Sequence, residues 1–318
     1  MTTYTFPTVA PVPTAEPKTL YTVASGDLRL SANSKCWPIQ QQLEADFARA
    51  VEALGWRVRR AHGVDPYTGH GFIDSQRRGM DVFRDIPPDA PLVVVDAVWQ
   101  YSHHVLPGLR THRGPVLAVA NWAGDFPGLV GLLNLAGSMT KAGVAYSSLW
   151  SEDFTDAWAV QKLAEWLDSG TIVHDVSHVW DLPELDGSSE EVRLGRALAD
   201  QLRREKAIIG VFDEGCMGMY NAIIDDELLN PLGIYKERLS QSALVAEMAK
   251  VPDAEAEAVR SWLDEAGLRF HFGTDPDTEL TPEQVHSQLK IYIAAMRISD
   301  DFGLDAVGIQ YQQGLKDT

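Results

Sequence analysis

The sequence predicts an α/β protein in which strands and helices alternate to build parallel sheets. Short apolar blocks such as Val116–Ala120 indicate buried strands, because β-branched residues alternate with alanine and no charge interrupts them. Segments such as 39–54 carry apolar residues at helical spacing and stop at a glycine. Since the two patterns alternate along the chain, a doubly wound parallel sheet is the expected architecture.

Composition limits the classes of partner. A length of 318 residues predicts about two domains. The hydrophobic content of 45% and charged content of 23% are those of an ordinary globular protein. A formal net charge of −18 argues against nucleic acid as a partner, because phosphate binding needs a positive surface. Small neutral or cation-assisted substrates are the easier expectation.

The termini and cysteines add further limits. Residues 1–19 form a proline-rich leader that we expect to be extended, and they carry neither the basic segment nor the apolar run of a secretory signal. Cys36 and Cys216 lie far apart, which excludes a disulfide framework and a cysteine-rich zinc site. Since no apolar run is long enough to span a membrane, we expect a cytoplasmic protein without a membrane partner.

The first expected domain covers residues 20–204, with the βαβ unit Val116–Trp150 at its centre. Thr155 or Asp153 is the expected cap of the helix that follows this unit. The expected elements are a strand at 20–24, a loop at 25–38, a helix at 39–54, a strand at 56–61, a helix near 75–84, a strand at 92–98, the strand, helix and strand of 116–150, a helix at 155–168, an irregular stretch at 170–188 and a charged helix at 188–204.

The second expected domain covers residues 205–318. Asp253 and Thr281 are its expected helix caps. Because its strands are few, either another element covers the last strand or polypeptide is missing at this edge. The expected elements are a strand at 207–212, helices at 236–249 and 254–266, a strand at 268–272, a helix at 282–300 and a strand at 306–309.

Aromatic residues follow two strands that we expect to be neighbours. Trp122 follows the strand at Val116–Ala120, and Trp99 and Tyr101 follow the strand before it. Ligands bind at the carboxyl ends of strands in α/β sheets, so these side chains suit the rim of a sugar or ring site. The alternative is that they pack between sheet and helices.

Acidic and amide side chains follow two strands of the second domain. Asp213 and Glu214 come directly after the strand at 207–212 and could bind a metal or act as a base; the alternative is acidic residues in a turn. Gln310, Gln312 and Gln313 end the last strand, where amides could donate hydrogen bonds to hydroxyl groups or simply be exposed.

Other motifs give less. His103, His104 and His112 are the local histidine cluster, but their spacing fixes no zinc geometry, and residues that shape a pocket wall are the alternative. The sequence has no Walker loop, no GxGxxG after a strand and no GxSxG elbow. A nucleotide-dependent enzyme and a serine hydrolase therefore lack their motifs.

Three runs carry a family resemblance. They read NWAGDFPGLVGLLNLAGSMTKAGVAYSSLWSEDF from residue 121, GVFDEGCMGMYNAIIDDELLNPLGIYKERLSQ from residue 210 and AVGIQYQQGLKDT from residue 306. In this order they resemble the L-fucose isomerase/L-arabinose isomerase family and its fucose isomerase-like members. The resemblance implies two Rossmann-like or flavodoxin-like domains in series, followed in the family by a C-terminal domain that this chain lacks.

The resemblance also implies a function and site residues. Family members are Mn²⁺-dependent homo-oligomers that interconvert aldoses and ketoses through a metal-chelated enediol. By similarity Gln310 touches the sugar, Trp99 forms a substrate wall shared across the subunit interface, and Trp122 lies close to the substrate rim. In the loop SANSKCWP, Lys35 takes the place of a basic substrate contact. The family's metal ligands correspond to positions beyond Thr318, so no manganese ligand is assigned to this chain.

Two functions follow as expectations. The first is a metal-dependent isomerase of L-fucose, L-arabinose or a related sugar, represented by its two N-terminal domains. The second is a non-catalytic sugar-binding or subunit-interface module that keeps the aromatic rim without the metal. Both predict a monosaccharide ligand and a homo-oligomer.

Overall fold

In the computed structural model the described residues are 8–97, 101–215, 218–309 and 315. The chain forms two compact units, which we call unit 1 (Met1–Trp180 with Met217–Ala222) and unit 2 (Asp181–Cys216 with Ile223–Thr318). Each unit is α/β and contains a sheet whose described strands are all parallel, so the predicted fold class is confirmed. The helix expected to close the first domain belongs with unit 2.

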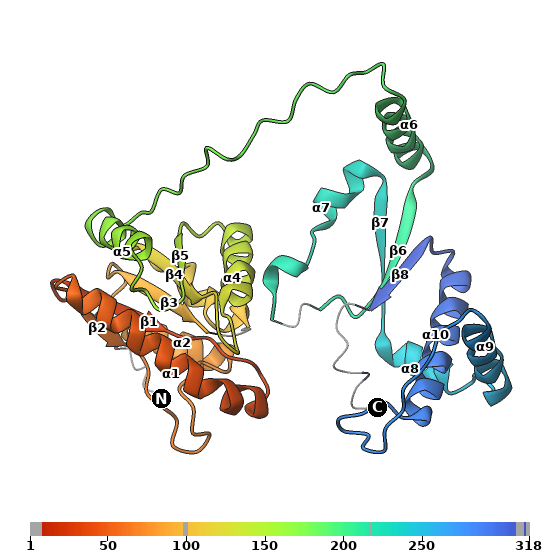
Figure 1. Ribbon diagram of the computed structural model, residues 1–318, viewed down its shortest axis with the longest axis horizontal. Helices are drawn as coiled ribbons and strands as arrows, with labels where there is room; N and C mark the ends of the chain where they lie inside the picture. The colour runs from red at the N-terminus through yellow and green to blue at the C-terminus, as the bar shows by residue number, and fades with distance from the viewer. Residues whose placement is uncertain (1–7, 98–100, 216–217, 310–314, 316–318) are drawn as a thin grey trace, which may run out of the picture. The chain divides into compact units, whose positions relative to one another are not determined.

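Unit 1 is a five-stranded parallel sheet with strand order β2-β1-β3-β4-β5. Its helices lie on both faces of the sheet (Figure 1). The elements are β1 (Thr19–Val23), α1 (Leu30–Ala53), β2 (Arg57–Arg60), α2 (Gln76–Asp85), β3 (Leu92–Asp96), η1 (Ser102–His104), α3 (Leu106–Leu109), β4 (Val116–Asn121), α4 (Leu129–Ala142), β5 (Ser147–Ser151) and α5 (Ala157–Ser169).

Two apolar layers hold unit 1 together. Helices α1 and α5 pack on one face, where Phe47 and Trp166 are fully buried against Leu117. Helices α2, α3 and α4 cover the other face with residues such as Leu135 and Leu109. Every residue of β1, β3 and β4 is buried, which is the pattern of parallel strands covered on both sides.

Helix α1 departs from the sequence prediction. The expected loop at 25–38 was wrong in its second half, because α1 begins at Leu30 and Pro38 lies inside it. Proline removes one helical hydrogen bond and normally interrupts a helix. Here the neighbouring side chains Asn33, Trp37 and Gln40 are buried, and their packing offsets that loss. The family-like segment SANSKCWP is therefore helical.

The start of α5 also differs in its cap. Asp156, rather than Thr155 or Asp153, accepts the backbone N–H of Ala159, at 2.9 Å. Asp153 instead accepts the N–H and hydroxyl of Thr155 in the preceding turn. After α5, residues 170–188 contain no helix or strand, as the sequence predicts.

A short segment from later in the chain completes unit 1. Residues 218–222, which we call the docked segment, lie against η1 and α4. The hydroxyl of Ser102 donates to the carbonyl of Gly218 at 2.7 Å, and Ser138 donates to Asn221 Oδ1 at 3.1 Å. Gly218 has φ of +79°, and a Cβ there would lie 2.0 Å from the Tyr101 ring, so only glycine fits.

Unit 2 contains a three-stranded parallel sheet with order β7-β6-β8. Thr281 as a helix cap and the strand 306–309 were both predicted and are confirmed, and the structure shows that Thr281 and Gln284 form a capping box. The elements that follow α5 are α6 (Glu190–Glu205), β6 (Ala207–Phe212), η2 (Tyr220–Ala222, part of unit 1), α7 (Asp226–Leu229), η3 (Asn230–Leu232), β7 (Ile234–Leu239), α8 (Gln241–Met248), α9 (Asp253–Glu265), α10 (Pro282–Phe302) and β8 (Ala306–Ile309).

Three expectations for unit 2 were wrong. Part of the expected helix 236–249 is strand β7, because IYKERL pairs along the whole of β6 before α8 begins. The expected strand 268–272 has no strand structure. Helix α9 takes Pro252 as its cap, and Asp253 lies at its first helical position, where its charge suits the helix dipole.

The two faces of the unit 2 sheet differ in cover. Phe212 and Leu239 lie on one face, in an apolar cluster with residues of α8 and α10. Ile209 and Val211 point to the opposite face and are only partly buried. Helix α6, which is described along its whole length, has no buried residue.

Candidate functional site at the sheet edge of unit 1

A pocket lies at the carboxyl edge of the unit 1 sheet. The order β2-β1-β3-β4-β5 reverses direction between β1 and β3, and ligands of such sheets bind in the crevice at this point. The loops after β1 and β4 enclose a hollow of about 340 Å³ there, which we call the edge pocket. It is lined by Asp27, Arg29, Ala32, Asn33, Cys36, Asp125, Phe126, Pro127 and Val130.

Asn33 and Asp27 form the wall that follows β1. The Asn33 side chain accepts the N–H of Asp27 and donates to the carbonyl of the same residue, both at 2.8 Å. Asn33 is 3% exposed, so both hydrogen bonds are shielded from water. This pair of bonds holds the β1 loop against the first turns of α1.

Asp27 and Arg29 form an ion pair in this wall. The Asp27 carboxylate accepts the backbone N–H of Arg29 at 2.9 Å and its guanidinium at 3.0 and 2.6 Å. Burial raises the pKa of Asp27, but the hydrogen bonds and charge of Arg29 outweigh burial, and the net pKa lies below the ordinary value. Asp27 is therefore an ionised hydrogen-bond acceptor at neutral pH and not a proton donor.

Asn121 organises the wall that follows β4. Its Oδ1 accepts the N–H of Gly128 at 2.9 Å, and its Nδ2 donates to the carbonyls of Ala123 at 2.8 Å and Phe126 at 3.2 Å. A Cβ at Gly128 would lie 1.7 Å from the carbonyl oxygen of Asp96, so glycine is required where this loop crosses β3. One amide thus closes the loop that carries Asp125.

Lys35 and Phe126 meet beside the pocket. The Lys35 Nζ lies 5.9 Å from the centre of the Phe126 ring, within the range of a cation–π contact. Cys36, the next residue on α1, lines the pocket, and burial raises the pKa of its thiol although the charge of Lys35 opposes this. The Cys36 side chain is therefore a neutral thiol at neutral pH.

The two helices that begin at the pocket have no side-chain cap. Helix α1 starts after Arg29 and α4 after Gly128, and neither has an acidic residue in its first turn. Free backbone N–H groups at a helix N-terminus can donate to oxygen atoms of a ligand.

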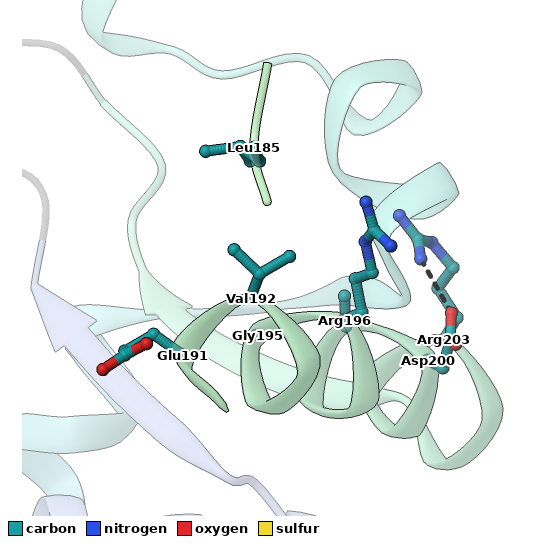
Figure 2. A pocket seen from close by; sticks show the side chains of 8 residues that line it. Leu185, Glu191, Val192, Gly195, Arg196, Asp200 and Arg203 are labelled. Carbon is teal, nitrogen blue, oxygen red and sulfur yellow. Dashed lines mark hydrogen bonds and ion pairs between the residues drawn. The ribbon is translucent and has the colours of Figure 1, made fainter. Parts of the chain in front are cut away.

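Two other hollows lie elsewhere on the chain. One of about 580 Å³ in unit 2 is bounded by a single face of α6 and by Leu185 (Figure 2). Figure 2 shows Val192 and Arg196 along the helix, with Leu185 on a separate stretch opposite them. The other, of about 640 Å³, lies between leader residues 10–13 and the end of α2. Neither lies at the carboxyl edge of a sheet, so the edge pocket is the better candidate.

The structure places two of the four predicted sugar contacts. Trp122 follows β4 and is 52% exposed, in the loop that also carries Asp125, and Lys35 lies on α1 beside Phe126. Trp99 and Gln310 lie outside the described residues. Tyr101, predicted for the same rim, is instead buried and stacked on His104, with the ring centres 5.4 Å apart.

Sequence reasoning missed most of the pocket lining. Asp27, Asn33 and Cys36 went unnoticed because residues 25–38 were interpreted as an open loop. On a helix that begins at Leu30, Asn33 and Cys36 are three residues apart and share one face. The signal that could have found them is the polar run SANSK, read as the first turns of a helix.

The histidines of the sequence cluster serve separate local contacts. His104 donates through Nδ1 to the carbonyl of Ile73 at 3.0 Å, and His112 bonds the carbonyl of Ala90 through Nε2 at 2.8 Å. Burial lowers the pKa of His103, His104 and His112. These bonds join His104 and His112 to neighbouring loops of unit 1, and none of the three histidines is among the residues that line the edge pocket.

Glu214 is occupied by ion pairs within unit 2. It accepts from Arg238 Nε at 2.7 Å and is paired with Lys236, and both cations also pair with Asp226. Burial raises the pKa of Glu214, but hydrogen bonds from Lys236 and Arg238 outweigh it, and the net pKa lies below the ordinary value. The structure therefore favours a structural role for Glu214.

Manganese does not fit the side chains that the structure describes. Within residues 8–97, 101–215, 218–309 and 315, no three histidine, cysteine or acidic side chains gather in a way that could hold a metal ion. The Mn²⁺ that the family resemblance implies therefore has no assigned ligands here.

Comparisons with known proteins add little. No protein-family model and no curated protein matches the chain. The chain is similar to a solved structure, the crystal structure of a sugar ABC transporter from Yersinia enterocolitica subsp. enterocolitica 8081. The match has 13% sequence identity and a TM-score of 0.23, and it covers 95% of this chain and 69% of the other. At this TM-score the likeness carries no argument for fold or function. No described helix has the length and hydropathy to cross a membrane.

Proposed function

We propose that unit 1 binds a monosaccharide in the edge pocket. The observation that carries the proposal is the pocket itself, a hollow of about 340 Å³ at the strand-order reversal of a parallel sheet. Hydrogen-bonding side chains and the aromatic ring of Phe126 face one space, the combination that small-molecule sites use for affinity and orientation.

The charges at the pocket favour a neutral ligand. Asp27 and Arg29 neutralise each other. Lys35 and Asp125 have no ion-pair partner among the described residues, and their charges are opposite. Sugar hydroxyl groups can donate to a carboxylate and accept from an ammonium group, so both charges can be used without a charged ligand.

Titration calorimetry with L-fucose and L-arabinose tests sugar binding. Removing the Asp125 charge with Asp125→Asn should weaken binding about tenfold, because a hydrogen bond to a charged group is stronger than one to an amide. Asp168→Asn on the exposed side of α5 is the matched control and should bind as the wild type does. Absence of binding to the wild-type chain would reject the proposal.

A second candidate function is aldose–ketose isomerisation, favoured by the three sequence runs that resemble the fucose and arabinose isomerase family. Incubation of the purified chain with Mn²⁺ and either sugar, followed by chromatography of the products, tests it. Formation of the ketose above a protein-free Mn²⁺ control supports isomerisation. No conversion, together with sugar binding, leaves the chain as a sugar-binding module.

We also propose that the chain is a cytoplasmic homo-oligomer. Large apolar side chains are exposed on and beside the segments that line the edge pocket, and they form what we call the apolar rim. Such patches are typical of protein interfaces. The rim consists of Leu28, Leu30, Trp122, Val130 and Leu133.

Light scattering of the purified chain tests the assembly. We expect a mass above that of one chain for the wild type and a lower mass for Leu133→Lys, because a buried unpaired charge opposes association. Leu194→Lys, on an exposed face of α6, is the control and should leave the mass unchanged. A monomeric wild-type chain would remove this part of the proposal without affecting sugar binding.

A further inference from the structure

The two walls of the edge pocket are each held by one buried asparagine. We infer that Asn33 and Asn121 are positioning residues that set the width of the pocket and, through it, the affinity for the sugar. This inference rests on the proposed sugar-binding function. The role it assigns to these two side chains is to hold the pocket walls, and this role does not require contact with the ligand.

Asn33 acts on the β1 wall through a closed pair of hydrogen bonds. Its amide pairs with both the N–H and the carbonyl of Asp27, as one strand residue pairs with another. A Cβ at Gly26 would lie 2.6 Å from Asn33 Oδ1, so the loop backbone is in close contact with this amide. The position of Asp27, and of Arg29 paired with it, is therefore fixed from α1.

Asn121 acts on the opposite wall through three bonds. Its oxygen anchors Gly128 at the start of α4, and its nitrogen draws in the carbonyls of Ala123 and Phe126. The residue is 6% exposed, so water does not replace these bonds easily. Phe126, which lines the pocket and meets Lys35, is held by the last of them.

The chemistry requires asparagine at both positions. Each site needs a donor and an acceptor on the same planar group, which aspartate and leucine do not offer. Aspartate keeps the accepting oxygen and loses every donated bond. Its second oxygen would also face the carbonyls that the asparagine Nδ2 now meets, and its charge would be buried, so aspartate variants should disturb the walls at least as much as alanine variants do.

The test reads the pocket in two independent ways. Cys36 lines the pocket, so its rate of alkylation by iodoacetamide, measured in a Cys216→Ser background, reports the looseness of the walls without any ligand. Calorimetric titration with L-fucose reports affinity. Thermal unfolding of each variant reports stability, which a purely structural role would change without the other two.

For Asn33→Ala and Asn121→Ala we expect Cys36 to react about threefold faster or more and the dissociation constant to rise about tenfold. The aspartate variants should change both readouts at least as much as the alanine variants do. Ser147→Ala is the matched control. Ser147 is also buried and its hydroxyl accepts the N–H of Ile172 at 3.0 Å, but it is the first residue of β5 and is not among the residues that line the pocket. This variant should lower stability and leave both readouts unchanged.

The inference fails if the asparagine variants melt earlier, as the control does, and yet leave alkylation and affinity at wild-type values. If one alanine variant does not fold, the alanine variant of the opposite wall decides by the same two readouts. If the wild type binds no sugar while alkylation still responds, the proposed function fails and the positioning role stands. If the wild type binds the sugar but neither alkylation nor affinity changes in the variants, the proposed function stands and the positioning role fails.

Discussion

The two units contain the same kind of sheet and differ in how it is covered. In unit 1, helices pack on both faces, and the residues of β3 and β4 are buried without exception. In unit 2, the apolar cluster around Phe212 lies on one face of the sheet only, and β7 contains partly buried and exposed residues but no buried one. The composition of a strand therefore reflects how many faces of its sheet are covered: β3, covered on both faces, reads LVVVD, whereas β7 reads IYKERL.

The largest expected effect is in the unit 1 core. Phe47→Ala should destabilise the chain by about 3–5 kcal/mol, because a fully buried ring that packs edge-on against Phe154 is removed. Ile209→Ala in β6 should cost about 1–2 kcal/mol, since this side chain lies on the less covered face and is only partly buried. Urea unfolding measures both. An equal loss of stability in the two variants would contradict the conclusion that the unit 1 sheet is covered more completely than the unit 2 sheet.

Acid should weaken unit 1 through three buried histidines. Burial lowers the pKa of His62 to about 2, and it also lowers the pKa of His70 and His104. The unfolded chain binds these protons below about pH 6.5, so stability is complete above this pH and falls below it. His62 alone contributes a loss of roughly 1.4 kcal/mol per pH unit down to its pKa in the fold, and His70 and His104 add losses in the same direction.

Urea unfolding near pH 7.5 and pH 5.5 checks this loss. His62→Gln keeps an acceptor for the N–H of Ala24 and cannot take up a proton, so it should reduce the difference between the two pH values. The same pH dependence in wild type and variant would show that His62 is not responsible.

A smaller effect is expected from the ion pairs of unit 2. Glu214→Gln should cost about 1–2 kcal/mol, because Lys236 and Arg238 lose one carboxylate and keep Asp226. The pKa of Glu214 is lowered in the fold, so its contribution is present above the unfolded pKa and disappears as the pH falls through the folded value. Unfolding curves of wild type and variant should therefore differ at neutral pH and approach each other at acidic pH.

The smallest effect is expected on α6. Leu198→Gln should change stability by about 0.5 kcal/mol or less, because the side chain is exposed on a helix without buried residues. Thermal unfolding checks this expectation. A loss of several kcal/mol in stability would show that α6 is covered in solution, and the two units would then differ less in how completely they are covered.

The elements that the sequence predicted best have local signals. Helix α10 has a capping box at Thr281 and Gln284, and β4 is an unbroken apolar block. The start of α1 was missed because Pro38 is a local stop signal that tertiary packing overrides. Strand β7 was missed because its charged residues gain their pairing only from β6.

The candidate site was predicted less well than the fold. The carboxyl edge of the sheet follows from the alternation of strands and helices, and Trp122 was found there from its place after β4. Asn33 and Asn121 were not assigned roles, since their bonds go to backbone groups that only the folded loops bring near. The sequence identifies an asparagine side chain but does not show which backbone groups the fold will place within its hydrogen-bonding distance.

The docked segment affects the order in which the chain can fold during synthesis. Unit 1 needs residues 218–222, yet α6 and β6 of unit 2 are made before them. At about 5–20 residues per second, residues 181–222 require roughly 2–8 s of translation. During this interval the hydroxyls of Ser102 and Ser138 have each other as partners, at 2.9 Å, but lack their bonds to Gly218 and Asn221, so unit 1 gains these contacts only after the first part of unit 2 has been made.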